Sequence, residues 1–369
     1  MDWKRFSFIF LIIIILFSVV VLIGQVKSSP IVIITSMLAT TIAVATPLTL
    51  GALAGVFSER AGIVNIGIEG MMLSSAFFGW LGAIYMFHVF EYSIGISITM
   101  GVVFAILAGM AMGLLLAVLS ITYKVDQIIG GTVINILAVG LTGFLNRQMF
   151  FGRGSVFEGN VPNSPGVLPT IHIPLTEIFS PLCNSADCIL VVTSINKVFD
   201  QKPVAIAAIL LVFVSHYILF NTRWGLRTRA VGEHPKAADT VGINVIKMRY
   251  ANVIIGGAFA GLAGAYFTIE SVPSFEPLLT NGRGFISLAA MIFGNWTPIG
   301  AWTAALVFGA SQALNINIQI FRDVIPPQLA FLQQSYIVGL IPYILTMVIL
   351  TGIIGRTTPP AADGIPYEK

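Results

Sequence analysis

Long apolar stretches alternate with short polar ones along almost the whole chain. An apolar stretch of roughly 20 residues is long enough to cross a membrane as an α-helix. The pattern predicts about ten membrane helices, over residues 6–24, 31–57, 64–88, 93–121, 128–150, 204–221, 250–270, 284–296, 298–320 and 329–354. The segment 284–296 is short, and we expect it to be broken or re-entrant, with its backbone covered by protein or a water-filled cavity. The expected fold is a single all-α polytopic membrane domain over residues 1–369.

The first apolar run follows Lys4 and Arg5, an arrangement that secretory signal peptides share. The apolar part of a signal peptide is about 7–15 residues long and ends at small residues. Here the run from Phe6 to Ile23 is longer, and the residues GQVKSSP follow it. A retained first membrane helix is therefore the favoured interpretation, with a cleaved signal peptide as the alternative.

The composition is that of a membrane protein. Hydrophobic residues make up 56% of the chain and charged residues 9%, whereas a soluble domain carries about 25% charge. The net charge is +3, and no dense basic run occurs. The sequence therefore does not indicate a protein that binds nucleic acid.

Lysine and arginine set the predicted orientation, because they gather in the cytoplasmic loops of membrane proteins. With ten crossings, Lys4, Arg5, the basic loop 222–249 and Arg356 all fall on one side, which is then the cytoplasm. Both termini are cytoplasmic in this arrangement. Nine crossings would place Arg356 outside.

The segment 151–203 is external in the same arrangement, and it is rich in Pro, Ser and Asn. It is too long for a tight turn, so we expect a small external loop or cap. Cys183 and Cys188 lie within it. A disulfide is permitted outside the cytosol, and the sequence leaves a local bridge and two free thiols as equal alternatives.

Small residues recur at a spacing that suits close helix packing, at Gly51 and Gly55, Gly109 and Gly113, Gly257 and Gly261, and Ala260 and Gly264. In lipid, helices approach each other closely through such small faces. Packing within the bundle is enough to explain these positions.

The sequence contains no signature of an enzyme. It has no GxxxxGK[ST] phosphate loop and no HExxH or GxSxG motif, and its four histidines are widely separated. We therefore expect no catalytic residues, no bound metal and no cofactor on this chain.

The loop 222–249 carries the most informative soluble sequence, NTRWGLRTRAVGEHPKAADTVGINVIKMR from residue 221. Pro235 suits the first turn of a helix, because its missing N–H is not needed there, and Gly242 can end that helix. We expect about two helical turns with Ala237 and Ala238 as a small packing side, flanked by extended or turning arms. A basic loop that touches anionic lipid would explain the arginines alone. A helix that docks on a cytoplasmic partner explains both features.

Four stretches together resemble one known family. They are WGLRTRAVGEHPKAADTVGINV from residue 224, SERAGIVNIGIEGMML at 58–73, NGRGFISLAAMIFGNWTPIGA at 281–301 and the tail PYILTMVILTGIIGRTTPPAADGIPYEK at 342–369. They are similar to ATP-binding-cassette (ABC) importer permeases of the branched-chain amino acid and simple sugar superfamily, with the nucleoside-type permease subunit as the nearest subgroup. The resemblance covers roughly residues 35–155 and 204–369, and the external segment is the part that it does not match.

The resemblance implies a division of labour in a bacterial cytoplasmic membrane. This chain and a second, related permease would form the pathway, and two cytoplasmic ATPase subunits would bind ATP and move the permeases between outward and inward states. An external lipoprotein or periplasmic protein would deliver the solute. The ATPase-coupling residues would be those of the loop, namely Gly232, Glu233, His234, Pro235, Lys236, Ala237, Ala238, Asp239 and Gly242.

The stretch ERAGIVNIGIEG at 59–70 concentrates polar groups between two apolar runs. We expect Glu59 and Arg60 to form an exposed cytoplasmic turn with a local ion pair. Asn65 and Glu69 are four residues apart, so on a helix they would share one face. Charged groups within a membrane usually face a cavity or a partner. A role lining or supporting the solute pathway is favoured for both, and a hydrogen-bonded brace between helices is the alternative.

Other polar side chains within the spans are candidates for the pathway. Asn carries donors and acceptors that suit ribose hydroxyls and base edges, and aromatic rings can stack on a base. The candidate pathway residues are Asn65, Glu69, Asn135, Asn281, Arg283, Asn295 and Trp296. The external receptor would supply most of the affinity, so we expect few direct contacts.

Three alternatives stay open from the sequence. A simple sugar or a purine-like compound could replace the nucleoside in the same machine. An ion-coupled secondary transporter would need carboxylates near the middle of the membrane; Glu69 is one, but the docking loop would then have no purpose. A membrane-embedded enzyme would need a cluster of acids or histidines, which the sequence lacks.

Overall fold

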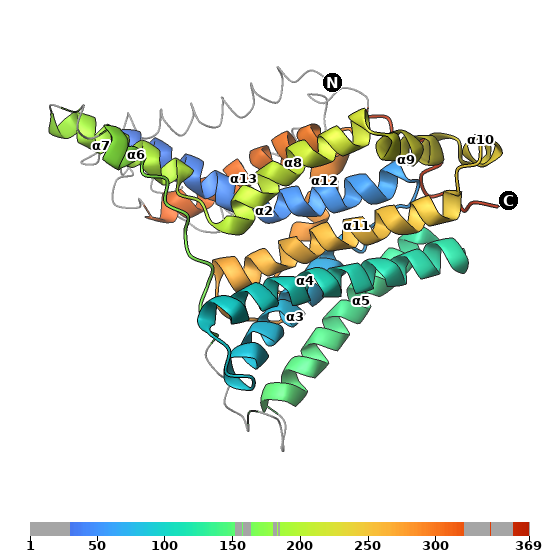
Figure 1. The fold of residues 1–369 in the computed structure, drawn as a ribbon, viewed down its shortest axis with the longest axis horizontal. Helices are drawn as coiled ribbons and strands as arrows, with labels where there is room; N and C mark the ends of the chain where they lie inside the picture. The colour runs from blue at the N-terminus through green and yellow to red at the C-terminus, as the bar shows by residue number, and fades with distance from the viewer. Residues whose placement is uncertain are drawn as a thin grey trace. The chain divides into compact units, whose positions relative to one another are not determined.

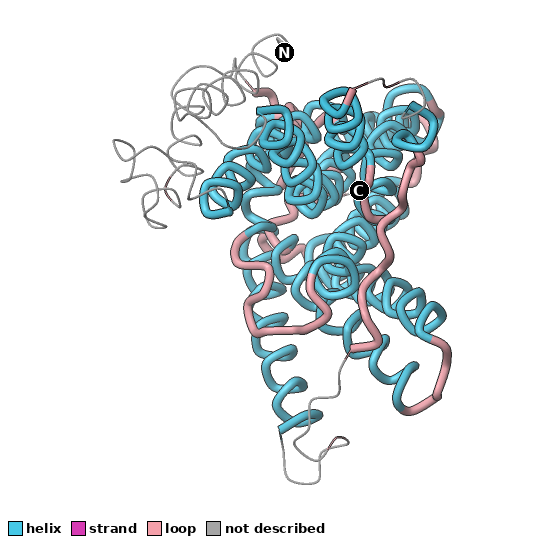
Figure 2. The backbone as a smooth tube through the Cα atoms, turned by 90° about the vertical axis from the view of Figure 1, so that its left-hand side faces the viewer, coloured by secondary structure: helices cyan, strands magenta, loops and turns pink. Residues whose placement is uncertain are grey.

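A computed structural model describes residues 30–151, 157, 164–179, 183, 185–320, 340 and 357–368. Within these residues every regular element is a helix, apart from one isolated antiparallel bridge between Ile171 and Gln201. Figure 2 shows helices joined by loops throughout this part of the chain. The predicted all-α class is confirmed.

Seven helices of the described residues are long and apolar enough to cross a membrane by length and composition, over Ile31–Arg60, Ile68–His88, Ile94–Thr122, Gln127–Phe151, Pro203–Asn221, Val245–Ser271 and Pro298–Ile320. Each corresponds to a predicted span. The predicted span 6–24 lies outside the described residues, and so does the span 329–354 apart from residue 340. The short segment forms α12, Arg283–Phe293, of only 11 residues, which is too short to cross a membrane alone. Its re-entrant path stays a prediction.

Large apolar side chains lie on the outer faces of several of these helices. Leu107, Ile128, Ile136, Phe144 and Leu210 are each more than half exposed. Exposed apolar surface of this extent marks contact with lipid or with another protein. Together with the seven apolar helices, it identifies a multi-span membrane protein.

The chain divides into two compact units. The first unit comprises Met1–Thr46, Pro169–Ile206 and Thr303–Thr357, and the second comprises Pro47–Leu168, Ala207–Trp302 and Thr358–Lys369. The helices α2 (Pro30–Arg60), α8 (Pro203–Asn221) and α13 (Pro298–Ile320) each contribute residues to both.

In the second unit, α3 (Ile68–His88), α4 (Ile94–Ala117), α5 (Gln127–Asn146) and α11 (Val245–Ala265) pack together. Figure 1 shows α4 and α11 side by side. A Cβ on Gly109 would lie 2.2 Å from the Gly257 carbonyl oxygen and 2.6 Å from the Gly261 Cα. The two backbones therefore touch through the glycines that the sequence pattern identified.

In the first unit, the beginning of α2 packs against the later part of α13. A Cβ on Gly309 would lie 2.7 Å from the Ala45 Cβ and 3.0 Å from the Thr41 carbonyl oxygen. The Ser36 hydroxyl also donates a hydrogen bond of 3.3 Å to Asn317, whose side chain is buried. Asn317 is therefore a brace between helices.

The same unit holds the part of the predicted external segment that the structure describes beyond Leu168. It contains two short helices, α6 (Leu175–Phe179) and α7 (Ala186–Phe199). The His172 imidazole lies 3.3 Å from the Asp200 carboxylate at its surface. This arrangement fits a small structured loop.

The loop 222–249 is more helical than predicted. The arm before Pro235 is α9 (Arg223–Glu233), because Thr222 caps it by accepting a hydrogen bond from the Gly225 N–H. The short helix α10 (Pro235–Thr240) has Pro235 in its first turn, and Gly242 follows it with φ +82°. The next membrane helix begins at Val245, five residues earlier than predicted, because Asn244 caps it through the Lys247 N–H. The expectation of two non-helical arms was therefore wrong.

Candidate functional site

The predicted interruption near residues 59–70 is a buried loop between two helices. α2 ends at Arg60 and α3 begins at Ile68, and Ala61, Ile63 and Asn65 between them have no exposed surface. Buried backbone outside a helix needs hydrogen-bond partners, because water cannot supply them.

Side chains from neighbouring helices supply these partners. The Val64 N–H donates to the Gln127 side-chain oxygen at 2.6 Å. The Asn135 side chain accepts from the Gly70 N–H at 2.7 Å and donates to the Ile66 carbonyl at 3.0 Å. Asn135 thus holds the start of α3 against α5. Gln127 was not among the predicted site residues; its position directly before the predicted span 128–150 was the available signal.

Glu59 corrects the expectation of an exposed turn with a local ion pair. Its side chain is only 3% exposed. It accepts a hydrogen bond of 2.6 Å from the Trp296 indole N–H and one of 3.4 Å from the Asn65 N–H. Arg60 turns away and donates to the backbone oxygens of Trp296 and Asn295, at 2.7 and 3.1 Å. Both side chains serve tertiary contacts.

Asn65 does not share a helix face with Glu69, because it precedes α3. It is fully buried, and its side-chain amide donates to the Ser58 hydroxyl at 3.2 Å. This geometry agrees with the alternative of a brace between helices.

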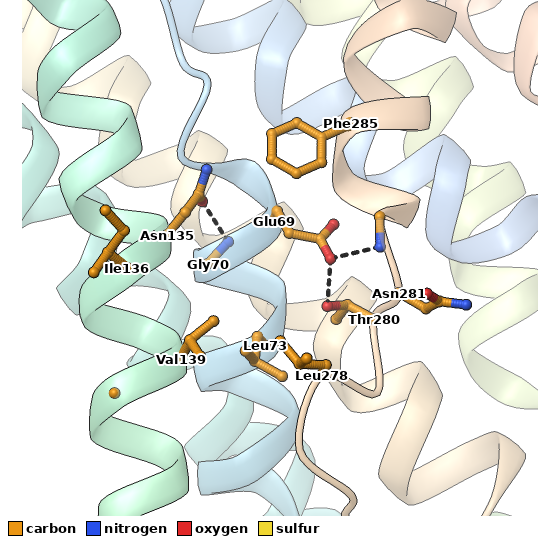
Figure 3. Close-up of a pocket in the computed structure, with 12 residues that line it drawn as sticks. Glu69, Gly70, Leu73, Asn135, Ile136, Val139, Leu278, Thr280, Asn281 and Phe285 are labelled. Carbon is orange, nitrogen blue, oxygen red and sulfur yellow. Dashed lines mark hydrogen bonds between the residues drawn. The ribbon is translucent and has the colours of Figure 1, made fainter.

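A pocket of about 580 Å³ opens beside the start of α3. Figure 3 shows side chains from α3, α5 and the segment leading into α12 around it. Three of the predicted pathway residues, Glu69, Asn135 and Asn281, line it. Its other lining residues are mostly apolar or glycine, and they are Gly70, Leu73, Ile136, Val139, Gly140, Leu278, Thr280, Gly282 and Phe285. We refer to it as the Glu69 pocket.

The Glu69 carboxylate joins α3 to the beginning of α12. One oxygen accepts from the Thr280 hydroxyl at 2.6 Å and from the Gly282 N–H at 2.8 Å, and the other accepts from the Gly284 N–H at 2.5 Å. The first N–H groups of a helix lack partners inside the helix and favour a negative charge. Glu69 therefore caps α12 and at the same time forms part of the pocket wall.

Glycine is required on the α12 side of this contact. A Cβ on Gly284 would lie 2.5 Å from the Glu69 Cα and 2.6 Å from the Glu69 nitrogen. Only glycine, which has no Cβ, fits that spacing without movement of a backbone. The pocket wall is consequently built from two helix beginnings in direct contact.

The pocket offers a solute a small set of polar and aromatic groups. Asn281 adopts φ +44°, a conformation that Asn tolerates better than most residues. Phe285, on the first turn of α12, is 48% exposed. An amide can pair with hydroxyl or base-edge groups, and a ring face can stack on a flat heterocycle.

The remaining pathway candidates do not line the Glu69 pocket. Arg283 begins α12, donates to the Leu279 carbonyl at 3.4 Å and lies 5.3 Å from the Phe267 ring centroid. Asn295 and Trp296 form the turn after α12, where both have φ +52°. Positive φ is rare for a bulky residue, and contacts to Glu59 and Arg60 hold Trp296 there.

Residues 358–368, which we term the C-terminal strap, lie against this turn and the α9–α10 segment. The strap residue Asp363 meets the Glu59 carboxyl group. Burial is the main cause that raises the pKa of Asp363 to about 7, while the hydrogen bond with Glu59 and the charge of Arg249 lower it.

This pKa predicts a pH dependence of the strap. Because the folded pKa is raised, the stabilisation is present below the ordinary pKa of about 3.9 and is lost as pH rises through the folded value. We expect protease cleavage in the strap, relative to a control peptide, to increase between about pH 6 and pH 8. Asp363→Asn should reduce this increase. Equal cleavage of the unaltered protein at both pH values would contradict the assignment.

The surface of α10 differs from the prediction at one position. Ala238 is 3% exposed and packs with Val231, Val245 and Met248. Ala237, by contrast, is exposed, and Val241 is 74% exposed. Ala237 is therefore the small, exposed residue of α10 that could contact a partner. Ala238 instead holds α10 against its own chain.

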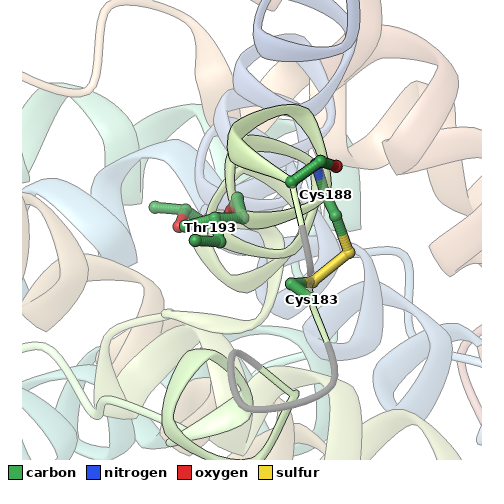
Figure 4. The surroundings of a disulfide bond; sticks show 5 residues. Cys183, Cys188 and Thr193 are labelled. Atoms are coloured by element: carbon green, nitrogen blue, oxygen red, sulfur yellow. A yellow bond between two sulfur atoms is a disulfide. The ribbon is translucent and has the colours of Figure 1, made fainter.

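The structure joins Cys183 and Cys188 in a disulfide (Figure 4), with Ser185 between them capping α7. We predict that this bond forms in cells. Labelling of intact cells with a thiol reagent should then modify either cysteine only after reduction. Cys183→Ser is the matched control, because it frees Cys188 for labelling without reduction. Labelling of the unaltered protein before reduction would show two free thiols.

Known proteins match most of the length of this chain. Residues 37–354 match the family described as branched-chain amino acid transport system, permease component. The chain is 39% identical to the guanosine ABC transporter permease protein NupQ of Bacillus subtilis, over 89% of this chain and 95% of NupQ. It is 35% identical to the nucleoside ABC transporter permease protein NupC of Lactococcus lactis, over 88% of this chain and 94% of NupC.

Two further relatives bear on the alternatives. TsgC13 of Haloferax volcanii, provisionally named a glucose ABC transporter permease, is 32% identical over 87% of this chain and 92% of its own length. A second guanosine ABC transporter permease protein of Bacillus subtilis, NupP, is 26% identical over 74% of this chain and 72% of NupP. One bacterium therefore contains two related permeases that are named for the same solute.

Proposed function

This chain belongs to the family of branched-chain amino acid transport system permease components, and we propose that it forms the membrane pathway of an ATP-driven importer for nucleosides. The observation that carries the proposal is the 39% identity to NupQ across 95% of that protein. The identity to NupC over a similar range supports the same solute class. The relation to TsgC13 keeps a simple sugar as the second candidate.

The Glu69 pocket is our candidate for part of the solute pathway. Its largely apolar wall suits a flat base, with the exposed face of Phe285 available for stacking. The amide of Asn281 can pair with a base edge or a ribose hydroxyl. Glu69 and Asn135 act mainly by holding the wall, because both already hydrogen-bond the backbone of neighbouring helices.

The driving force comes from separate subunits in this proposal. ATP binds to cytoplasmic ATPase subunits, and this chain carries neither a nucleotide nor a metal. α10 docks on the ATPase through its exposed side at Ala237, with the residues from Gly232 to Gly242 as the coupling segment. Contact of the same basic loop with anionic lipid is the competing interpretation.

A second permease completes the pathway, and an external solute-binding lipoprotein or periplasmic protein supplies the solute. The pair NupQ and NupP in one bacterium supports a related rather than an identical second chain. The site of action is the bacterial cytoplasmic membrane. With ten crossings, the turn that holds Lys124 falls on the same side as the C-terminus. Lys124 lies 3.0 Å from Glu368, and this proximity supports a common side for them.

Uptake of labelled guanosine by cells with and without this gene tests the proposal. We expect uptake to require the gene and an active partner ATPase, with unlabelled nucleosides but not glucose as competitors. Loss of glucose uptake alone would assign the sugar instead. Uptake that persists with an inactive ATPase would indicate an ion-coupled transporter.

A further inference from the structure

The C-terminal strap (residues 358–368) connects the proposed docking segment to the wall of the Glu69 pocket. We infer that it is a positioning element, which passes movement of α9 and α10 to α12 and so links ATP hydrolysis to solute movement. This inference rests on the proposed ATPase docking of α10. It requires the strap to be attached to α9 and α10 at one end and to the turn after α12 at the other. It also requires α12 to be stiff.

The first end of the connection lies at α9 and α10. The strap donates two backbone hydrogen bonds to the end of α9, from the Ala362 N–H to the Gly232 carbonyl at 2.8 Å and from the Ala361 N–H to the Glu233 carboxylate at 3.1 Å. Tyr367 packs against the buried cluster that contains Ala238 of α10. Movement of α10 would therefore move the strap.

Buried contacts fix the middle of the strap. Ala362 is 5% exposed, and the fully buried Arg249 of α11 donates to the Ile365 carbonyl at 3.0 Å. A Cβ on Gly62, in the turn after α2, would lie 3.0 Å from the Ala362 carbonyl oxygen. A C-terminal tail that positioned no other segment would not need such close contact between its backbone and the turn after α2. The exposed ion pair between Glu368 and Lys124 adds little, because solvent screens it.

The other end of the connection lies at the turn after α12. The Thr358 N–H donates to the Asn295 side-chain oxygen at 3.0 Å. Asn295 and Trp296 are two consecutive residues with φ +52°. Residues in such sparsely populated conformations persist only when their surroundings hold them, and they concentrate at functional and switching segments. The strap is one of the contacts that hold this turn.

α12 carries the connection from that turn to the pocket. It has 11 residues, which makes it about 16 Å long. Its last residue, Phe293, leads into the turn, and the Gly284 N–H at its beginning binds Glu69. A helix of this length moves as one piece. Displacement of the turn would therefore reach the Glu69 pocket without any large change in between.

Substitution at Asn295 tests the inference in the assembled transporter. Asn295→Gly tolerates the positive φ but removes the oxygen that Thr358 binds, while Asn295→Asp keeps that oxygen and serves as the conservative rescue. In membrane vesicles containing the whole complex, we would measure guanosine uptake, ATP hydrolysis and the amount of assembled complex. The hydrogen bond from Thr358 to Asn295 is exposed, and loss of one such bond corresponds to roughly a two- to fivefold change in an equilibrium. We therefore expect Asn295→Gly to raise the ATP hydrolysed per guanosine by about that factor, and Asn295→Asp to restore it.

Unchanged ATP consumption per guanosine in Asn295→Gly would overturn the inference. A parallel fall in complex, uptake and hydrolysis would also overturn it, since a brace for folding lowers all three together. Deletion of residues 358–369 gives a second measurement, with the same rise in ATP consumption expected. If the unaltered complex takes up no guanosine but hydrolyses ATP in response to another solute, the proposed cargo fails while the strap can still be tested with that solute.

Discussion

Glu69→Gln should reduce solute uptake at least about tenfold, while the chain still reaches the membrane. The carboxylate accepts three hydrogen bonds, from Thr280, Gly282 and Gly284. A glutamine offers only one oxygen, so its amide N–H would face a backbone N–H at the beginning of α12. An unsatisfied buried donor costs about 1–3 kcal/mol. The wall of the pocket would shift, because this contact joins α3 to α12.

Thr280 provides the matched control for this prediction. Thr280→Ser keeps the hydroxyl that binds Glu69 and should leave uptake close to normal. Thr280→Val removes one of the three hydrogen bonds and should have a smaller effect than Glu69→Gln. The measurement is the initial rate of uptake, divided by the amount of chain in the membrane. Normal uptake by Glu69→Gln would exclude a supporting role for this carboxylate in the pathway.

The helices were predictable because they depend on local composition. Each of the seven apolar helices lies in a mostly apolar stretch that is long enough to span a membrane. The short α12 and the small helix after Pro235 could also be predicted from the sequence, since Gly and Pro mark their boundaries. The boundaries that were missed depend on single capping side chains. Asn244 starts α11 five residues early, and the hydropathy pattern alone does not reveal such a cap.

The roles of individual polar residues were harder to predict from the sequence, because their partners are distant along the chain. Glu59 and Arg60 are neighbours, and adjacency suggested an exposed ion pair. In the structure both bind Trp296, which lies 237 residues after Glu59. Asn65 and Glu69 were predicted to share a helix face, but Asn65 lies in the buried loop before α3. The composition indicated that polar groups were needed near this break, but only the fold assigns a partner to each.

Ala237→Arg should abolish ATP-driven uptake and release the ATPase subunit, if α10 docks as proposed. Ala237 is exposed on α10 and small, so an arginine there would overfill a close contact. Overpacking costs about 1–3 kcal/mol, and each 1.4 kcal/mol weakens binding about tenfold. Ala238→Arg is the wrong test, despite its place in the same motif. Ala238 packs with Val231 and Val245 within the chain, so that substitution would disturb α10 itself.

Two matched variants separate bulk from charge at this position. Ala237→Ser should retain both uptake and co-purification of the ATPase subunit, because it adds only one small atom. Ala237→Gln adds a long side chain, although one shorter than arginine, without charge, and it should weaken docking if close packing is the cause. If α10 instead rests on anionic lipid, Ala237→Arg would add a favourable charge, and both uptake and co-purification would stay normal. Loss of the ATPase subunit in Ala237→Arg and Ala237→Gln, but not in Ala237→Ser, therefore distinguishes a protein partner from the membrane surface.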